Sequence, residues 1–248
     1  MNTKKLIAIS TLLGLIVAAP LAFAKNPNPG VLPPHSHAFG MTYGEWSAAW
    51  WQWAFSLPVD AHPLFDTADC SQGQSGKVFF LGWTFVTTVN PSGTVVGVAN
   101  RNCTVPAGKA LFFPIINTEC STLEGNGTTD AELRECAKFF QDHAIDLEGT
   151  IDGVPLQNLE SYRVQSPLFT YGPLPDNNVL QFFGIPGADE GATSPSVADG
   201  VYLLLAPLSV GNHTLHFSGG QSFSTAAGDP FDFEFELDVT YNLTVAPR

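Results

Sequence analysis

Two glutamates are the residues of this chain that could carry acid–base chemistry. Glu45 lies within a cluster of tryptophans, and Glu119 ends the apolar run KALFFPIINTE. Hydrolysis or elimination on a carbohydrate needs two carboxyl groups roughly 5 to 9.5 Å apart in a cleft. The sequence does not give that separation, and it shows neither a G-x-S-x-G motif nor a phosphate-binding loop. A carbohydrate-active enzyme is therefore one open alternative.

Aromatic and amide side chains near these glutamates could bind a ligand without catalysis. Trp51 and Gln52 follow Glu45 in the same segment, and Asn117 precedes Glu119. Flat aromatic faces beside amides suit a glycan or another small neutral ligand. Burial of the tryptophans in the core is the competing interpretation.

Histidines and aspartates do not indicate a metal site. The segment VDAHPLFDTADC holds three aspartates and a histidine without the alternate-position spacing and glycine of an EF-hand loop. His213 and His216 are three positions apart, so on a strand they point to opposite faces. We predict no metal and no other cofactor.

A helix is expected to position the first group of candidates. The segment YGEWSAAWWQWAFSLP contains four of the five tryptophans, and its aromatic residues recur at i, i+3, i+4 and i+7. Thr42 and Glu45 have the spacing of a capping box, and Pro58 ends the helix. Because an apolar stripe at helical spacing is usually core, we expect most of the tryptophans to be buried.

From Lys77 onward the sequence predicts β-structure. A hairpin is predicted over the segments KVFFLGWTFVTTV and GTVVGVANRNCTV. A strand buried on both faces is predicted over KALFFPII. The segment FDFEFELDVTYNLTV alternates apolar and polar residues throughout, which indicates a long antiparallel strand. We interpret the carboxylates on its wet face as charge that blocks edge-to-edge pairing, rather than as a cation site.

The remaining segments complete the predicted fold. A capping box at Thr129 predicts a second helix to about His143. Successive antiparallel strands near 178–184, 201–207, 213–217 and 231–245 would bring the loops IPGADEGATSPSVAD and SGGQSFSTAAGDP to one end, our expected binding face. The predicted fold is mainly β: an antiparallel, jelly-roll-like β-sandwich with an N-terminal Trp-rich helix and one further short helix.

Charge and cysteines limit the partners and the compartment. The chain has 23 acidic against 10 basic residues, which argues against nucleic acid as a partner. Its four cysteines, an even number, suit an oxidising compartment. The shortest loops favour Cys70 with Cys103 and Cys120 with Cys136, although two other connectivities are possible.

The N-terminal region predicts export. MNTKKLIAISTLLGLIVAAPLAFA has the basic start, apolar run and A-x-A site of a signal peptide, cleaved after Ala24. We assign residues 1–24 to the signal peptide, 25–40 to a Pro/Gly-rich arm and 41–248 to a single β-sandwich domain. The mature chain is expected in the periplasm or outside the cell, not embedded in the membrane.

Several motifs together resemble a known group of proteins. They are GEWSAAWWQW, CSQGQ, RNCTVPAGKALFFPIINTECS, VGNHTLHFSGG and DVTYNLTV. They resemble an uncharacterised family of exported bacterial and archaeal proteins, most specifically across residues 43–121. The resemblance implies secretion and a mainly β domain, and it implies no activity and no catalytic residues.

Three classes of function follow. The first is a secreted, disulfide-stabilised binding or envelope-surface protein without a catalytic motif, whose ligand is a glycan or a small neutral molecule. The second is a carbohydrate hydrolase or lyase that uses paired carboxylates. The third is a structural matrix or assembly subunit whose N-terminal arm adds to a neighbour's sheet. The sequence does not indicate the oligomeric state.

Overall fold

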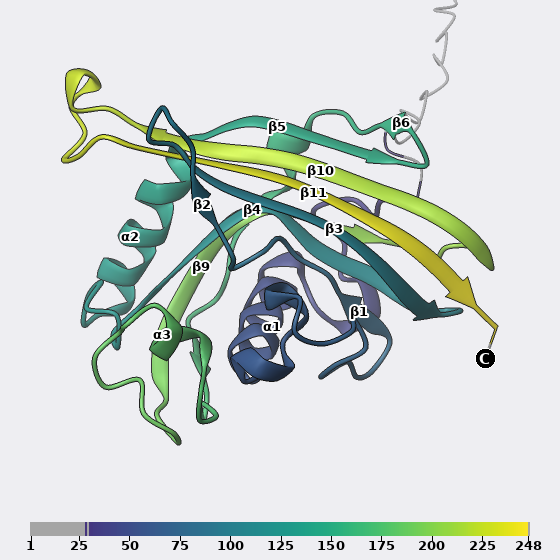
Figure 1. Cartoon of the computed structure of the whole chain (residues 1–248), viewed down its shortest axis with the longest axis horizontal. Coiled ribbons are helices and arrows are strands. Elements are labelled where there is room, and N and C mark those ends of the chain that lie inside the picture. Colours follow the sequence, from purple (N-terminus) through teal and green to yellow (C-terminus); the bar gives the residue numbers. More distant parts are fainter. Residues whose placement is uncertain (1–27, 29, 248) are drawn as a thin grey trace, which may run out of the picture.

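The protein is a two-sheet β-sandwich with a helix packed on the outside of one sheet (Figure 1). The computed structural model describes residue 28 and residues 30–247; the predicted signal peptide lies outside these residues. Phe112 and Phe113 show how the layers stack, because successive strand residues point to opposite faces. Phe112 contacts Tyr43 of the helix, and Phe113 stacks on Phe217 of the second sheet. The predicted mainly β sandwich is confirmed.

The first sheet has the order β1-β4-β9-β7, with β8 also paired to β9, and the second has the order β2-β3-β11-β10-β5-β6. The strands of the first sheet are β1 (Val78–Phe80), β4 (Ala110–Ser121), β7 (Arg163–Gln165), β8 (Phe169–Tyr171) and β9 (Ser194–Leu205). Those of the second are β2 (Thr88–Val89), β3 (Val95–Pro106), β5 (Ala144–Ile151), β6 (Val154–Pro155), β10 (Gly211–Phe223) and β11 (Phe233–Ala246). The α-helices are α1 (Tyr43–Phe55), α2 (Asp130–Asp142) and α3 (Val179–Phe182), and the 3-10 turns are η1 (Ala38–Gly40), η2 (Val59–Ala61), η3 (Pro63–Phe65), η4 (Leu159–Tyr162) and η5 (Thr225–Ala227).

Helix α1 begins with the predicted capping box. The Thr42 hydroxyl accepts the Glu45 N–H, and the Glu45 carboxylate accepts the Thr42 N–H at 2.7 Å. Trp50, Trp51 and Trp53 are buried, as expected of an aromatic stripe. The helix therefore packs into the domain through its indole rings.

We predicted an antiparallel sandwich, but each of the two sheets contains one parallel pair of strands. Strand β3 runs parallel to β11, and β1 runs parallel to β4. Strand β11 alternates in burial as its sequence predicts, but it lies between β3 and β10 (Figure 1). Our interpretation of its carboxylates as edge protection is therefore wrong, because β11 is an interior strand with a neighbour on both sides.

The predicted strand near 178–184 is wrong as well. Asn178 and Gln181 form a reciprocal capping box that starts the short helix α3. This local capping outcompetes the apolar run, which is too short to fix a strand by itself. Strands β9 and β10 also belong to different sheets, so they form no hairpin and the argument for one shared loop end fails.

The predicted hairpin before β3 is much shorter than expected. Only Thr88 and Val89 pair with β3, while Val78–Phe80 joins the other sheet as β1. The chain crosses between the sheets at Gly82, where an added Cβ would lie 2.6 Å from the Trp50 ring. The close approach to the buried indole explains why this position needs glycine.

Both favoured disulfides are present. Cys70 is joined to Cys103, and Cys120 is joined to Cys136. The second bond fastens α2 to the end of β4, as its spacing predicted. Disulfides persist in oxidising compartments, so both pairs suit a protein of such a compartment.

The described part of the predicted arm packs on the domain. Val31 forms an antiparallel bridge with Leu205 and is buried. The Tyr43 hydroxyl donates to the Leu32 carbonyl at 2.6 Å. Among the described helices, none is both long and apolar enough to span a membrane.

Candidate functional site

Asn117 and Trp51 lie in the interior between the first sheet and α1. The Asn117 side chain accepts from Trp83 Nε1 at 2.6 Å and donates to the Tyr202 hydroxyl at 3.1 Å. The Trp51 ring lies 6.4 Å from that of Trp83. Two of the three predicted ligand-binding residues are thus joined through Trp83 in a buried cluster, where they support the core.

Glu119 lies farther along β4, on the same face as Asn117. The Ser196 hydroxyl donates to its carboxyl group, which is buried. Burial, followed by the nearby Glu124 carboxylate, raises the pKa of Glu119 well above its usual value. Burial therefore favours the protonated form of the Glu119 carboxyl group.

The surroundings of Glu45 shift its pKa in the opposite direction to that of Glu119. The Glu45 carboxylate accepts hydrogen bonds from the backbone and side chain of Thr42, which lower its pKa. The ionised form of Glu45 is thus favoured at the start of α1, whereas burial of Glu119 at the end of β4 favours its protonated form. Neither glutamate lines the two clefts described next.

Gln52, the third predicted ligand-binding residue, lines a groove between α1 and the segment 73–80. Its amide nitrogen donates to the Thr170 carbonyl at 2.8 Å, which fixes the side chain at the groove wall. The groove has a volume of about 420 Å³. One wall is a helical stripe of Trp46, Ala49, Gln52, Trp53 and Ser56, and the other is formed by Gly73, Ser75, Gly76, Lys77, Val78 and Phe80.

Aromatic rings give the groove an apolar wall. The Phe80 ring lies 6.2 Å from Trp46 and 5.6 Å from Trp53. Trp46 and Phe80 are only half-buried, so part of each ring faces the groove. Gly73 lets the facing loop approach, because an added Cβ would lie 3.0 Å from Trp53 Nε1. Sequence reasoning missed Trp46 and Phe80, although the helical spacing of Trp46, Ala49 and Trp53 was visible.

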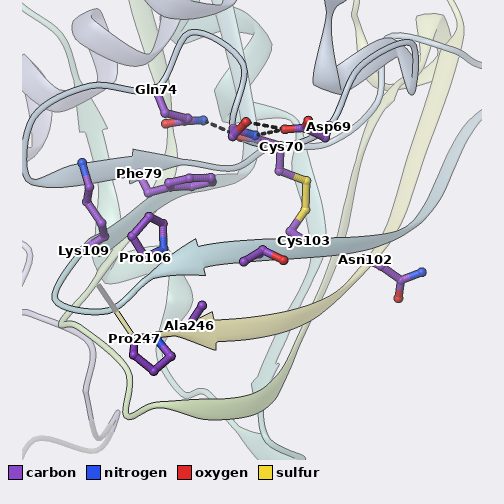
Figure 2. A pocket seen from close by; sticks show the side chains of 12 residues that line it. Asp69, Cys70, Gln74, Phe79, Asn102, Cys103, Pro106, Lys109, Ala246 and Pro247 are labelled. Carbon is purple, nitrogen blue, oxygen red and sulfur yellow. Dashed lines mark hydrogen bonds between the residues drawn. A yellow bond between two sulfur atoms is a disulfide. The ribbon is translucent and has the colours of Figure 1, made fainter.

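A second cleft, of about 590 Å³, lies beside the Cys70–Cys103 disulfide (Figure 2). Its polar groups are largely engaged within the protein. The Asp69 carboxylate accepts from the backbone and hydroxyl of Ser71, which lower its pKa. Lys109 donates to the Gly76 carbonyl. Few polar groups remain to bind a ligand, although the cleft is the larger of the two.

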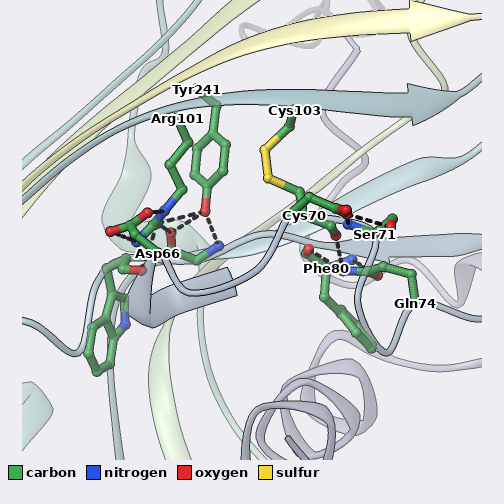
Figure 3. The surroundings of a disulfide bond; sticks show 11 residues. Asp66, Cys70, Ser71, Gln74, Phe80, Arg101, Cys103 and Tyr241 are labelled. Carbon is green, nitrogen blue, oxygen red and sulfur yellow. Dashed lines mark hydrogen bonds and ion pairs between the residues drawn. A yellow bond between two sulfur atoms is a disulfide. The ribbon is translucent and has the colours of Figure 1, made fainter. Parts of the chain in front are cut away.

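The same disulfide stands next to a buried arginine (Figure 3). Arg101 and Tyr241 extend from the neighbouring strands β3 and β11, and the guanidinium donates to the Tyr241 hydroxyl at 3.0 Å. It also donates to the carbonyls of Gly82 and Trp83. This cluster fastens the crossing segment to the second sheet and offers no open site.

Within residues 28 and 30–247, no group of three or more His, Cys, Asp or Glu side chains is arranged to hold a metal ion. His62 is buried, which lowers its pKa to about 4, and its ring bonds the Ala54 carbonyl and the Leu64 N–H. His213 is paired instead with Asp152 at 2.8 Å. These histidines have structural partners.

Comparison with known proteins does not assign the chain to a class. No protein-family model matches it, and neither the search of curated proteins nor that of solved structures finds a significant match. Its function must therefore be argued from the groove and the fold.

Proposed function

We propose that this is an exported binding protein whose groove between α1 and the segment 73–80 holds a small saccharide. The observation that carries the proposal is the pair of half-buried rings of Trp46 and Phe80 that line the groove beside the fixed amide of Gln52. A sugar ring has an apolar C–H face and a rim of hydroxyl groups. Aromatic rings complement the face, and an amide and hydroxyls complement the rim.

The size and charge of the groove agree with such a ligand. Its volume of about 420 Å³ lies within the usual range for small-molecule sites. Lys77 is the one charged residue among those that line it. The ligand class we favour is therefore a neutral saccharide, or one with a single anionic group.

Binding without catalysis is the function that we favour. Glu45 is fixed by the capping box, and the carboxyl group of Glu119 is buried and has a raised pKa. General acid–base catalysis requires both groups within reach of one substrate bond. The predicted signal peptide and the two disulfides support a place of action outside the cytoplasm.

A binding experiment with a blocking variant tests the proposal. Isothermal titration calorimetry should be carried out with glucose, galactose, N-acetylglucosamine and their β-linked disaccharides. At least one of these sugars should bind with a dissociation constant below about 1 mM. Ala49→Trp places an indole in the groove and should weaken that affinity at least tenfold. The matched control is Ala131→Trp, an exposed position on α2, which should leave binding unchanged. Absence of binding for the whole panel, or equal affinity in Ala49→Trp, would overturn the proposal.

A further inference from the structure

The two walls of the groove are held in different ways. Helix α1 is fixed by packing, because Trp50, Trp51 and Trp53 are buried in the core. The facing wall begins with a loop, SQGQSGK over residues 71–77, in which Gln74 is half-buried and the other six residues are exposed. A segment that buries few apolar side chains opens at little cost in free energy. The position of this loop therefore depends on bonds to its neighbours and not on packing.

The Cys70–Cys103 disulfide is the covalent bond at the start of the loop (Figure 3). Both cysteines are buried, and Cys103 belongs to β3 of the second sheet. The crosslink joins positions that are 33 residues apart in the sequence. It excludes every arrangement in which these positions separate. Cys70 therefore stays beside β3 while the bond is intact.

Hydrogen bonds connect this anchor to the residues of the groove (Figure 3). The Gln74 amide nitrogen donates to the Cys70 carbonyl at 3.1 Å and to the Phe80 carbonyl at 2.8 Å. The Gln74 amide oxygen accepts the Phe80 N–H at 2.8 Å. From the other wall, Trp53 Nε1 donates to the Gln72 carbonyl at 3.2 Å. The disulfide, the Gln74 amide and an aromatic residue of the groove thus form one continuous series of contacts.

We propose that the Cys70–Cys103 disulfide positions the wall of the groove, so that a saccharide binds the oxidised chain more tightly than the reduced one. This inference rests on the proposed function, because it concerns the affinity of the same groove. In the reduced chain only hydrogen bonds would hold the loop 71–77 against α1. The apparent affinity then falls with the fraction of molecules whose wall is in place.

A dithiol reductant can reach the disulfide without displacing the saccharide. Cys70 and Cys103 line the second cleft, of about 590 Å³, which shares none of its described lining residues with the groove (Figure 2). One thiolate of the reductant attacks a cysteine sulfur and forms a mixed disulfide, and its second thiol then displaces that cysteine. Two electrons and two protons pass to the cysteines, which become thiols, and the reductant becomes a disulfide.

The other disulfide of the chain provides a matched control. Cys120–Cys136 joins β4 to α2, and neither element is among the described residues that line the groove. Its removal should lower stability without moving the groove wall. The two bonds therefore separate an effect on position from a general effect of losing a crosslink.

Titration calorimetry on the chain lacking residues 1–24 tests the proposal, with glucose, galactose, N-acetylglucosamine and their β-linked disaccharides as probes. The variant C70A/C103A should bind about tenfold more weakly than the wild type, whereas C120A/C136A should bind equally well. Circular dichroism spectra like that of the wild type show that each variant is folded. Equal affinity of C70A/C103A and the wild type overturns the proposal.

Two further measurements do not require removal of the disulfide. Gln74→Ala leaves the bond intact but removes its connection to Phe80, and it should also weaken binding. In C120A/C136A, the sugar should shift the equilibrium of Cys70–Cys103 with dithiothreitol toward the disulfide, because linkage makes the two effects reciprocal. Wild-type affinity in Gln74→Ala, or an equilibrium that the sugar does not shift, contradicts the positioning role.

Hydrogen exchange of the ligand-free chain separates this inference from the proposed function. The backbone N–H groups of Gln72, Gln74 and Phe80 are hydrogen-bonded within this part of the chain. They should exchange about tenfold faster in C70A/C103A than in the wild type, and at the wild-type rate in C120A/C136A. A wild type that binds no sugar overturns the proposed function, whereas unchanged exchange in C70A/C103A overturns positioning by the disulfide.

Discussion

Asp66 binds the guanidinium of Arg101 at two points, with Oδ1 2.5 Å from Nε and Oδ2 3.2 Å from Nη2. The arginine side chain is 5% exposed, whereas that of the aspartate is 53% exposed. A nearly buried cation is thus neutralised by a carboxylate at the surface, and the pair fastens the loop after α1 to the second sheet.

Replacement of Asp66 by Asn should destabilise the fold, because it leaves the Arg101 cation buried without a counter-charge. We expect a loss of about 2 kcal/mol in the free energy of unfolding, below the full cost of breaking a buried pair because water reaches Asp66. Urea denaturation measures it. Asp60→Asn, at an exposed aspartate near the same loop, is the control and should have little effect. Equal midpoints for the two variants would contradict this role of Asp66.

Glu119 should make stability fall as the pH rises. Burial raises the pKa of this carboxyl group in the folded chain, while in the unfolded chain the group ionises near the usual value. Its contribution is therefore complete below about pH 4.5 and is lost as the pH rises through the folded pKa. Glu119→Gln keeps a neutral group, so its melting temperature should exceed that of the wild type at pH 8 and approach it at pH 4. A wild type that is more stable than the variant at pH 8 would show that the ionised form is accommodated.

The His143–Asp229 pair should also make stability fall as the pH rises, because the protonated His143 ring is the form that Asp229 stabilises. The hydrogen bond to the Phe139 carbonyl and the contact with Asp229 at 2.9 Å raise the pKa of His143. Stability from the protonated ring is complete below about pH 6.5 and is lost as the pH rises through the folded pKa. His143→Gln should therefore lower the melting temperature more at pH 5.5 than at pH 8.5. A loss independent of pH would indicate that packing alone is affected.

Gly44→Ala should destabilise the protein although alanine favours helix formation. The added Cβ would lie 2.7 Å from the Gln165 carbonyl oxygen, which belongs to the backbone of β7 and cannot turn aside. Alanine gains up to about 1 kcal/mol in helix propensity, while overpacking costs about 1 to 3 kcal/mol. We expect a net loss by urea denaturation. A stabilised variant would mean that α1 does not pack this closely on β7.

Local signals in the sequence predicted the local structure. The capping residues Thr42 and Thr129 start α1 and α2, and short loops predicted both disulfides. The alternation of β11 predicted which of its faces is buried. Each of these features depends on residues close in the chain, so the pattern alone contains the information.

Pairing between distant segments was not predictable in this way. Alternation shows that β11 has a buried face, but it does not show that its neighbour is β3 in parallel orientation. The groove is formed by α1 and the segment 73–80 after folding, so Phe80 could not be identified in advance. The raised pKa of Glu119 depends on its burial and on the nearby Glu124 carboxylate, and neither can be read from the residue type alone.

The parallel alignment of β3 with β11 has a consequence for the order of assembly. Asn242 bonds Asn100 from 142 positions away, so the middle of the second sheet stays incomplete until the last strand has been synthesised. Contacts of such separation slow folding and expose apolar surface meanwhile. A truncation that removes β11 should therefore yield an insoluble product, because β3 and β10 would both lose their shared neighbour.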